Sequence, residues 1–153
     1  MTVEWYLAEL VMKITVADDP RNVVHQNLVL IKANSPDDAY EKAINLGKNE
    51  ESSYTNPYGK VVQFTFEGLS GLDLIDEELG DGAELTFRSK VGVSDDQLHL
   101  MVLPRDRLHA FLPPMEAEGP NYASGDILAL LKRDYGINRA DGPDPGDTDP
   151  SAK

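Results

Sequence analysis

Hydrophobic and polar positions alternate along residues 5–16. A period of two places successive side chains on opposite faces of a strand, so one face here is apolar and the other mixed. The pattern predicts a long strand in an antiparallel sheet that is covered on one side. The apolar face consists of Tyr6, Ala8, Leu10, Met12, Ile14 and Val16.

Residues 28–31, LVLI, form an unbroken apolar run, which is typical of a strand buried on both faces. The turn-forming residues 18–22 connect it to the first strand and predict a hairpin. A helix is predicted over residues 36–46, because Ser35 can cap it and Asp38 stands where a capping box has its acid. Gly47 is expected to end that helix in the left-handed conformation.

The remaining patterns predict three more strands and one more helix. Val62, Phe64 and Phe66 share one face of a strand over residues 61–69, and residues 85–93 and 97–103 form a hairpin. A capped helix is predicted over residues 124–135. We therefore expect an α+β fold. Its antiparallel sheet has about five strands in the order β-β-α-β-β-β, with the first helix packed on one face and the second as a C-terminal addition.

The domain organisation follows from the same patterns and from length. A chain of 153 residues can bury a core without disulfides or metals. We expect one domain over residues 1–136. Residues 137–153 are rich in Pro, Gly and Asp, and this composition predicts a disordered acidic tail.

Composition narrows the class of partner. The chain carries 27 acidic and 14 basic residues, a formal net charge of −13, which repels nucleic-acid backbones and anionic lipid. It has no cysteine, so disulfides and thiolate chemistry are excluded. With no secretory signal and no apolar run of membrane length, we expect a soluble, cytoplasmic protein.

No motif predicts catalysis, a metal site or a cofactor. The histidines at positions 25, 99 and 109 lack ligand spacing, and no Gly-x-Ser-x-Gly nucleophile elbow is present. The acids within residues 73–84 do not match the twelve-residue calcium loop. A solvated acidic loop is the simpler interpretation.

Two groups of residues are candidates for binding another protein. Exposed aromatic side chains favour interfaces, and an acidic loop can steer a basic partner. The alternative is structural: Trp5 covers the sheet edge, the tyrosines pack over the helix and the acids keep the loop in water. The candidates are the aromatic residues Trp5, Tyr54 and Tyr58 and the acidic residues Asp73, Asp76, Glu77, Glu78 and Asp81.

Three motifs carry a resemblance to a known family: WYxAEL from Trp5, NLVLIxAxS from Asn27 and FxFxGL from Phe64. With these motifs, residues 5–74 resemble a bacterial domain-of-unknown-function family. The resemblance implies a β-β-α-β core and no activity, cofactor or catalytic residue.

We interpret the chain as a bacterial, non-enzymatic protein-binding module with an acidic surface, of the immunity-type or nucleic-acid-mimic kind. Its partner is expected to be another protein with a basic surface. The alternative is a small hydrolase or ligand-binding enzyme whose site no motif reveals. A deep pocket with an acid and a histidine would favour the enzyme, and a flat acidic face with exposed aromatics the binding module.

Overall fold

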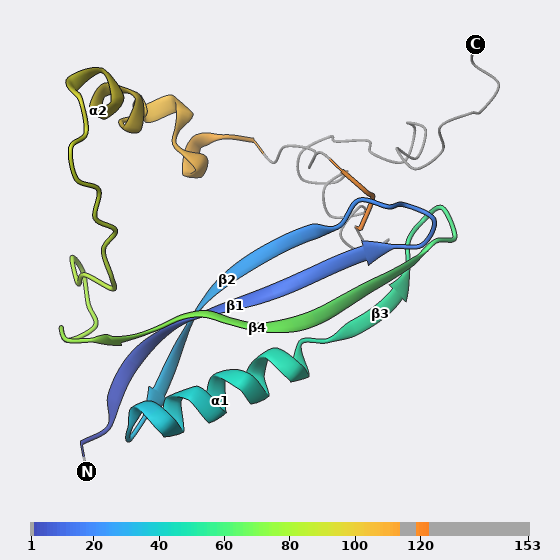
Figure 1. Cartoon of the computed structure of the whole chain (residues 1–153), viewed down its shortest axis with the longest axis horizontal. Helices are drawn as coiled ribbons and strands as arrows, with labels where there is room; N and C mark the ends of the chain where they lie inside the picture. Colours follow the sequence, from blue (N-terminus) through green and yellow to red (C-terminus); the bar gives the residue numbers. More distant parts are fainter. Residues whose placement is uncertain (1, 114–118, 123–153) are drawn as a thin grey trace.

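The computed structural model describes residues 2–113 and 119–122. Figure 1 shows a long, curled sheet with one helix along it and a second helix that stands apart. In chain order the elements are β1 (Glu4–Val16), β2 (Val23–Ala33), α1 (Pro36–Asn49), β3 (Ser52–Thr55), β4 (Val61–Ile75), α2 (Asp95–Met101) and the 3-10 turns Arg105–Arg107 and His109–Phe111.

The sheet is antiparallel, and its strand order is β2-β1-β4-β3. The predicted α+β class and the hairpin of the first two strands are confirmed. β1 pairs with β2 without interruption, whereas its ladder with β4 is broken by two register shifts, at Glu9/Leu10 and at Val11/Met12. Among the described residues the sheet has four strands in the chain order β-β-α-β-β, so the expected five strands in the order β-β-α-β-β-β are not found there, and the short strand β3 was not predicted.

The covered face of the sheet is the one that the alternation in β1 predicts. Tyr6, Ala8 and Leu10 form a buried cluster with Ile31 and Ala33 of β2 and with Ala39 and Ala43 of α1. Partly buried Val29, Leu46, Phe66, Leu69 and Leu72 surround it. Because α1 covers only this face, the other face, which we call the open face, carries the odd-numbered residues of β1.

The prediction that residues 28–31 are buried on both faces is wrong. β2 lies at the sheet edge and alternates in burial, with Leu28 57% and Leu30 44% exposed, whereas Ile31 is 6% exposed. Leu28 and Leu30 point to the open face, which neither of the described α-helices covers.

Helix α1 begins as its sequence predicts. The Asp38 N–H donates to Ser35 Oγ at 3.1 Å, and the Asn34 N–H donates to Asp38 Oδ2 at 3.0 Å. Its end differs, since the helix runs to Asn49 and Glu50 is the C-cap. Gly47 lies inside the helix, where a Cβ would overlap the ring of Phe66. This glycine permits close packing of helix on sheet, so the left-handed cap predicted there is wrong.

The predicted hairpin of residues 85–93 and 97–103 is also wrong. Residues 85–93 contain no strand, and α2 occupies Asp95–Met101. The cause is a capping box in which the Gln97 N–H donates to Ser94 Oγ and the Ser94 N–H donates to Gln97 Oε1. The predicted helix at 124–135 and the tail at 137–153 lie outside the described residues.

A returning segment, residues 119–122, covers the other end of the helix-bearing face. Tyr122 packs with Tyr54 and Phe64 against a second buried cluster of Ile14, Val16 and Val62. Asn56 fixes this segment, because its Nδ2 donates to the Asn121 carbonyl at 2.9 Å. Within the described ranges, no helix is long and apolar enough to cross a bilayer.

Candidate functional site

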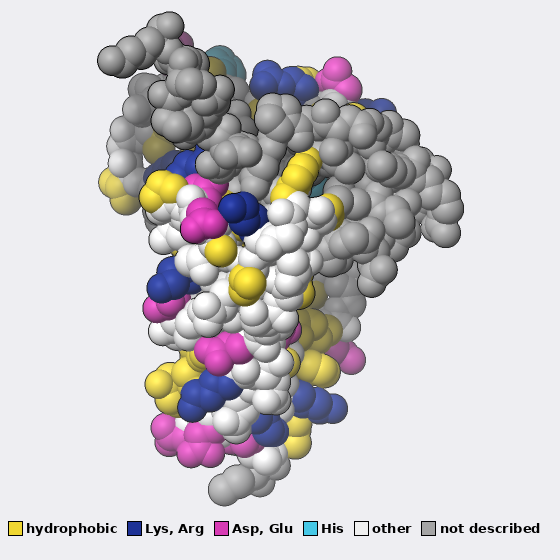
Figure 2. Space-filling model, turned by 90° about the vertical axis from the view of Figure 1, so that its right-hand side faces the viewer, with side chains coloured by type: hydrophobic (Ala, Val, Ile, Leu, Met, Phe, Trp, Pro, Cys, Tyr) yellow, Lys and Arg dark blue, Asp and Glu magenta, His cyan; other side chains and the backbone are white. Residues whose placement is uncertain are grey.

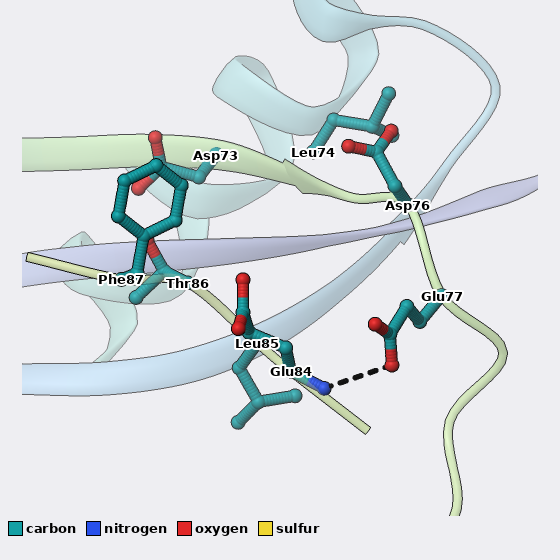
Figure 3. Close-up of a pocket in the computed structure, with 8 residues that line it drawn as sticks. All are labelled: Asp73, Leu74, Asp76, Glu77, Glu84, Leu85, Thr86 and Phe87. Atoms are coloured by element: carbon teal, nitrogen blue, oxygen red, sulfur yellow. Dashed lines mark hydrogen bonds between the residues drawn. The ribbon is translucent and has the colours of Figure 1, made fainter.

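A groove forms where β4 ends and the chain folds back beside it (Figure 3). Residues 84–87 run alongside the end of β4, and the two segments enclose a cavity of about 300 Å³. We call this cavity the acidic groove. It is lined by Asp73, Leu74, Asp76, Glu77, Glu84, Leu85, Thr86 and Phe87.

Local hydrogen bonds hold the two walls of the acidic groove together. The Glu84 N–H donates to Glu77 Oε2 at 3.0 Å, which closes the loop between them. Within that loop the Ala83 N–H donates to the Gly80 carbonyl at 3.1 Å, and Gly82 adopts a positive φ of 86° that favours glycine. The loop sequence therefore places Glu77 and Glu84 across the acidic groove from each other.

The lining of the acidic groove combines negative charge with apolar surface. Four of its eight residues are acidic and none is basic, while Leu85 and Phe87 are 42% and 75% exposed. On the face of the molecule that Figure 2 shows, acidic and basic side chains are interspersed over the described surface. The acidic groove can thus accept a cationic group beside an apolar one.

A smaller cavity of about 150 Å³ continues the acidic groove onto the open face. It shares Asp73, Thr86 and Phe87 with the acidic groove and adds Leu7, Glu9, Leu28 and Arg88. Arg88 Nη2 lies 3.9 Å from Glu9 Oε1, so a cation of the chain itself already sits beside a carboxylate here.

The described residues offer no evident metal centre, because no group of three or more His, Asp or Glu side chains among them could hold an ion. None of the histidines lines the acidic groove. His25 lies 3.4 Å from the Tyr122 hydroxyl, and His99 and His109 are exposed beyond residue 94.

The structure brings some of the predicted binding residues together. Asp73, Asp76 and Glu77 line the acidic groove, and Glu78 and Asp81 are exposed on the loop that closes it. Trp5 lies at the same end of the sheet, opposite Ile75, but it does not line the acidic groove. Its ring is half-buried, with Lys32 Nζ 5.5 Å from the ring centre.

The two tyrosines lie at the opposite end of the sheet. Tyr54 pairs with Val62, which pairs with Val16, so it is separated from Trp5 by the length of β1, roughly 35 Å. Its hydroxyl donates to the Tyr122 carbonyl, and burial, with a smaller contribution from Tyr122, raises the pKa of Tyr54. The Tyr58 N–H donates to Asn56 Oδ1 within a turn. These contacts give Tyr54 a packing role.

Sequence reasoning missed Glu84, Leu85 and Phe87 as residues of this site. Leu85 and Phe87 fall within the strand that the sequence predicts over residues 85–93. Their exposure follows from the absence of that strand, and the available signal was their position directly after the acidic loop.

These features define a class: an α+β domain whose four-stranded antiparallel sheet bears one helix and an acidic groove at the end of β4. A model of the family described as Domain of unknown function (DUF4288) matches residues 5–87, more than half of the 153-residue chain. The chain belongs to this family, so the predicted resemblance is confirmed and extends to the acidic groove. No curated protein matches the chain, and no solved structure does.

Proposed function

We propose that this protein is a non-enzymatic binding module of bacteria that takes a basic segment of another protein in the acidic groove. The carrying observation is that four carboxylates and the exposed side chains of Leu85 and Phe87 line one cavity without a base. Charge alone would suit any cation. The apolar side chains favour a peptide segment in which lysine or arginine alternates with apolar residues.

The state of the carboxylates supports this proposal. Asp73, Asp76 and Glu84 form no ion pair with any residue in the described ranges, and all three are exposed. Like charges held near one another in water contribute little to folding. A basic partner would relieve their repulsion, and the attraction would increase the association rate more than the affinity.

The segment after the acidic groove, residues 88–113, offers further contact surface. In Figure 1 it rises from the sheet, and α2 has no buried residue. Large exposed apolar side chains that gather on one segment are typical of an interaction surface. Its most exposed large apolar side chains are Val91, Leu100 and Val102.

The experiment captures partners from a lysate of the source cell and then measures their association by surface plasmon resonance at low and high salt. The groove variant Asp73→Asn/Asp76→Asn/Glu84→Gln removes three charges while leaving Glu77, which holds the loop. The control Asp37→Asn/Glu41→Gln/Glu50→Gln removes three exposed charges on and beside α1.

A partner that uses the acidic groove associates more slowly with the groove variant at low salt and at the wild-type rate with the control. The difference shrinks at high salt, because screening removes long-range attraction. Equal association rates for all three proteins across the salt series would contradict the proposal.

The enzymatic alternative expects a histidine and an acid together in a pocket. No histidine lines the acidic groove, and this lining supports binding over acid–base catalysis by such a pair.

A further inference from the structure

Among the described residues, no further strand pairs with the outer edge of β2. β2 spans Val23–Ala33 and pairs on one side only, with β1. Among the described residues, Lys42 Nζ is the single group from outside the sheet that hydrogen-bonds the β2 backbone, at 2.9 Å from the Lys32 carbonyl. The backbone of residues 23–31 therefore presents donors and acceptors on its outer side.

β2 also lacks the features that protect edge strands. Natural edges are protected by proline, by bulges or by charged side chains. Residues 23–31, VVHQNLVLI, contain neither proline nor a side chain of Asp, Glu, Lys or Arg, and their ladder with β1 has no bulge. The opposite edge of the sheet is β3, which has four residues and offers a much shorter template.

Apolar side chains line the open face along this same edge. Val24, Leu28 and Leu30 are each more than two-fifths exposed and share the open face of one strand with Gln26, which stands between Val24 and Leu28. A strand added beside β2 would cover their flanks and satisfy the backbone in the same step.

The charge distribution indicates which strand fits there. The chain has a formal net charge of −13, so two copies repel except where acids are missing. Residues 20–36 contain no Asp or Glu and carry Arg21 and Lys32, which makes β2 and its flanks the longest acid-free stretch of the sheet and its helix. Two copies can meet here without bringing carboxylates together.

We infer that the edge of β2 pairs antiparallel with the β2 edge of a second copy of this chain. The pairing is two-fold symmetric and joins two four-stranded sheets into one of eight strands. Val24, Leu28 and Leu30 of the two copies then lie together on the open face, with Gln26 between Val24 and Leu28. Because α1 packs near Ile31 and Ala33, the two helices lie toward opposite ends of the joint. The inference does not depend on what the acidic groove binds, although Leu28 also lines the smaller cavity beside that groove.

The first test measures the molar mass of the full chain by light scattering and sedimentation from micromolar to near-millimolar concentration. A dimer is expected for the wild type. Leu28→Lys/Leu30→Lys places charges at the joint and should give a folded monomer, because both side chains are exposed in the single chain. Tyr40→Lys/Asn45→Lys, which adds the same two charges at exposed positions of α1, is the matched control and stays dimeric.

The second test locates the joint. The natural chain has no cysteine, so single cysteines at positions 24, 26, 28 and 30 report only on their own symmetry copies. In a two-fold antiparallel pairing one position faces itself with a Cα separation of about 5 Å, whereas a position two residues away lies about 13 Å from its copy. Disulfide formation should therefore be fastest at one position and fall off on either side.

A wild type that remains monomeric at the highest concentration would overturn the inference. The edge would then be covered by a strand of another protein or by another segment of this chain. A dimer that crosslinks through Phe87→Cys or Leu100→Cys, and not through the cysteines along β2, would also overturn it. Loss of the dimer in Tyr40→Lys/Asn45→Lys as well as in Leu28→Lys/Leu30→Lys would do the same, because lysines placed outside β2 would then disrupt association equally.

Discussion

At the scale of single residues, Gly47 shows how packing can reverse an effect expected from local preference. Alanine favours a helix interior over glycine by about 1 kcal/mol, so Gly47→Ala would stabilise an isolated helix. Here the added methyl group meets the Phe66 ring, and overpacking of this kind costs about 1–3 kcal/mol. We expect Gly47→Ala to lower the free energy of unfolding in urea. Asn45→Ala on the exposed side of α1 is the control and should raise it slightly. Equal behaviour of the two variants would show that the ring moves aside freely.

The carboxyl of Asp38 gives the helix start a pH dependence. The Asn34 N–H and, to a smaller extent, the Lys42 ammonium hold the pKa of Asp38 below its ordinary value. The folded state thus prefers the ionised form, so the contribution to stability is present at neutral pH and is lost as the pH falls below about 4. Asp38→Asn should destabilise the protein at pH 7, and its difference from the wild type should narrow at pH 3. Asp37→Asn, which removes an acid from the same turn, serves as the control. A difference that is the same at both pH values would exclude this role for the charge.

At the scale of elements, the sequence predicts what local signals specify. The alternation in β1, the turn at 18–22 and the Ser35 cap depend on neighbours within a few residues, and all three are found in the structure. The burial of β2 depends on strand order, which no local signal carries. The capping box of α2 is also a local signal, but residues 97–103 additionally show Leu98, Leu100 and Val102 at alternate positions, a pattern that favours the predicted strand.

The same division applies to the candidate site. Three of its four acids, Asp73, Asp76 and Glu77, were predicted, because the acids of residues 73–84 stand without a base. The packing of Tyr54 was not predicted, because it depends on contact with residues 119–122, which are distant in sequence.

Neighbouring residues of β2 provide a test of strand placement. Ile31 faces the core under α1 and Leu30 faces the open side. We expect Ile31→Ala to cost about 2–5 kcal/mol, because it leaves a cavity. Leu30→Ala should cost well under half as much when measured on monomeric protein at low concentration. Chemical denaturation of both variants compares the two faces within one strand. A larger loss for Leu30→Ala would mean that the open face is covered in the single chain.

At the scale of the whole molecule, charge is unevenly distributed. Residues 73–84 carry six acids and no base, whereas residues 85–113 carry four bases and three acids. The acidic end and the segment that follows it therefore differ in sign as well as in structure. Such separation contributes to steering and partner choice, and it opposes folding through repulsion within the acidic end.

The last prediction tests whether that repulsion is present in the folded protein. Glu78→Gln/Asp81→Asn removes two exposed charges of the acidic loop that do not line the acidic groove. If the loop acids repel one another, this variant should melt at a higher temperature than the wild type in low salt. In about 0.5 M salt the Debye length is below about 8 Å, so the two melting temperatures should converge. Asp95→Asn/Asp96→Asn is the control with the same charge change, but these acids lie in the first turn of α2, where a negative charge is favourable. The control should not raise the melting temperature. A lower melting temperature of the loop variant in low salt would show that the acids stabilise the fold. Their stabilising effect would then account for the cluster of acids without a binding partner.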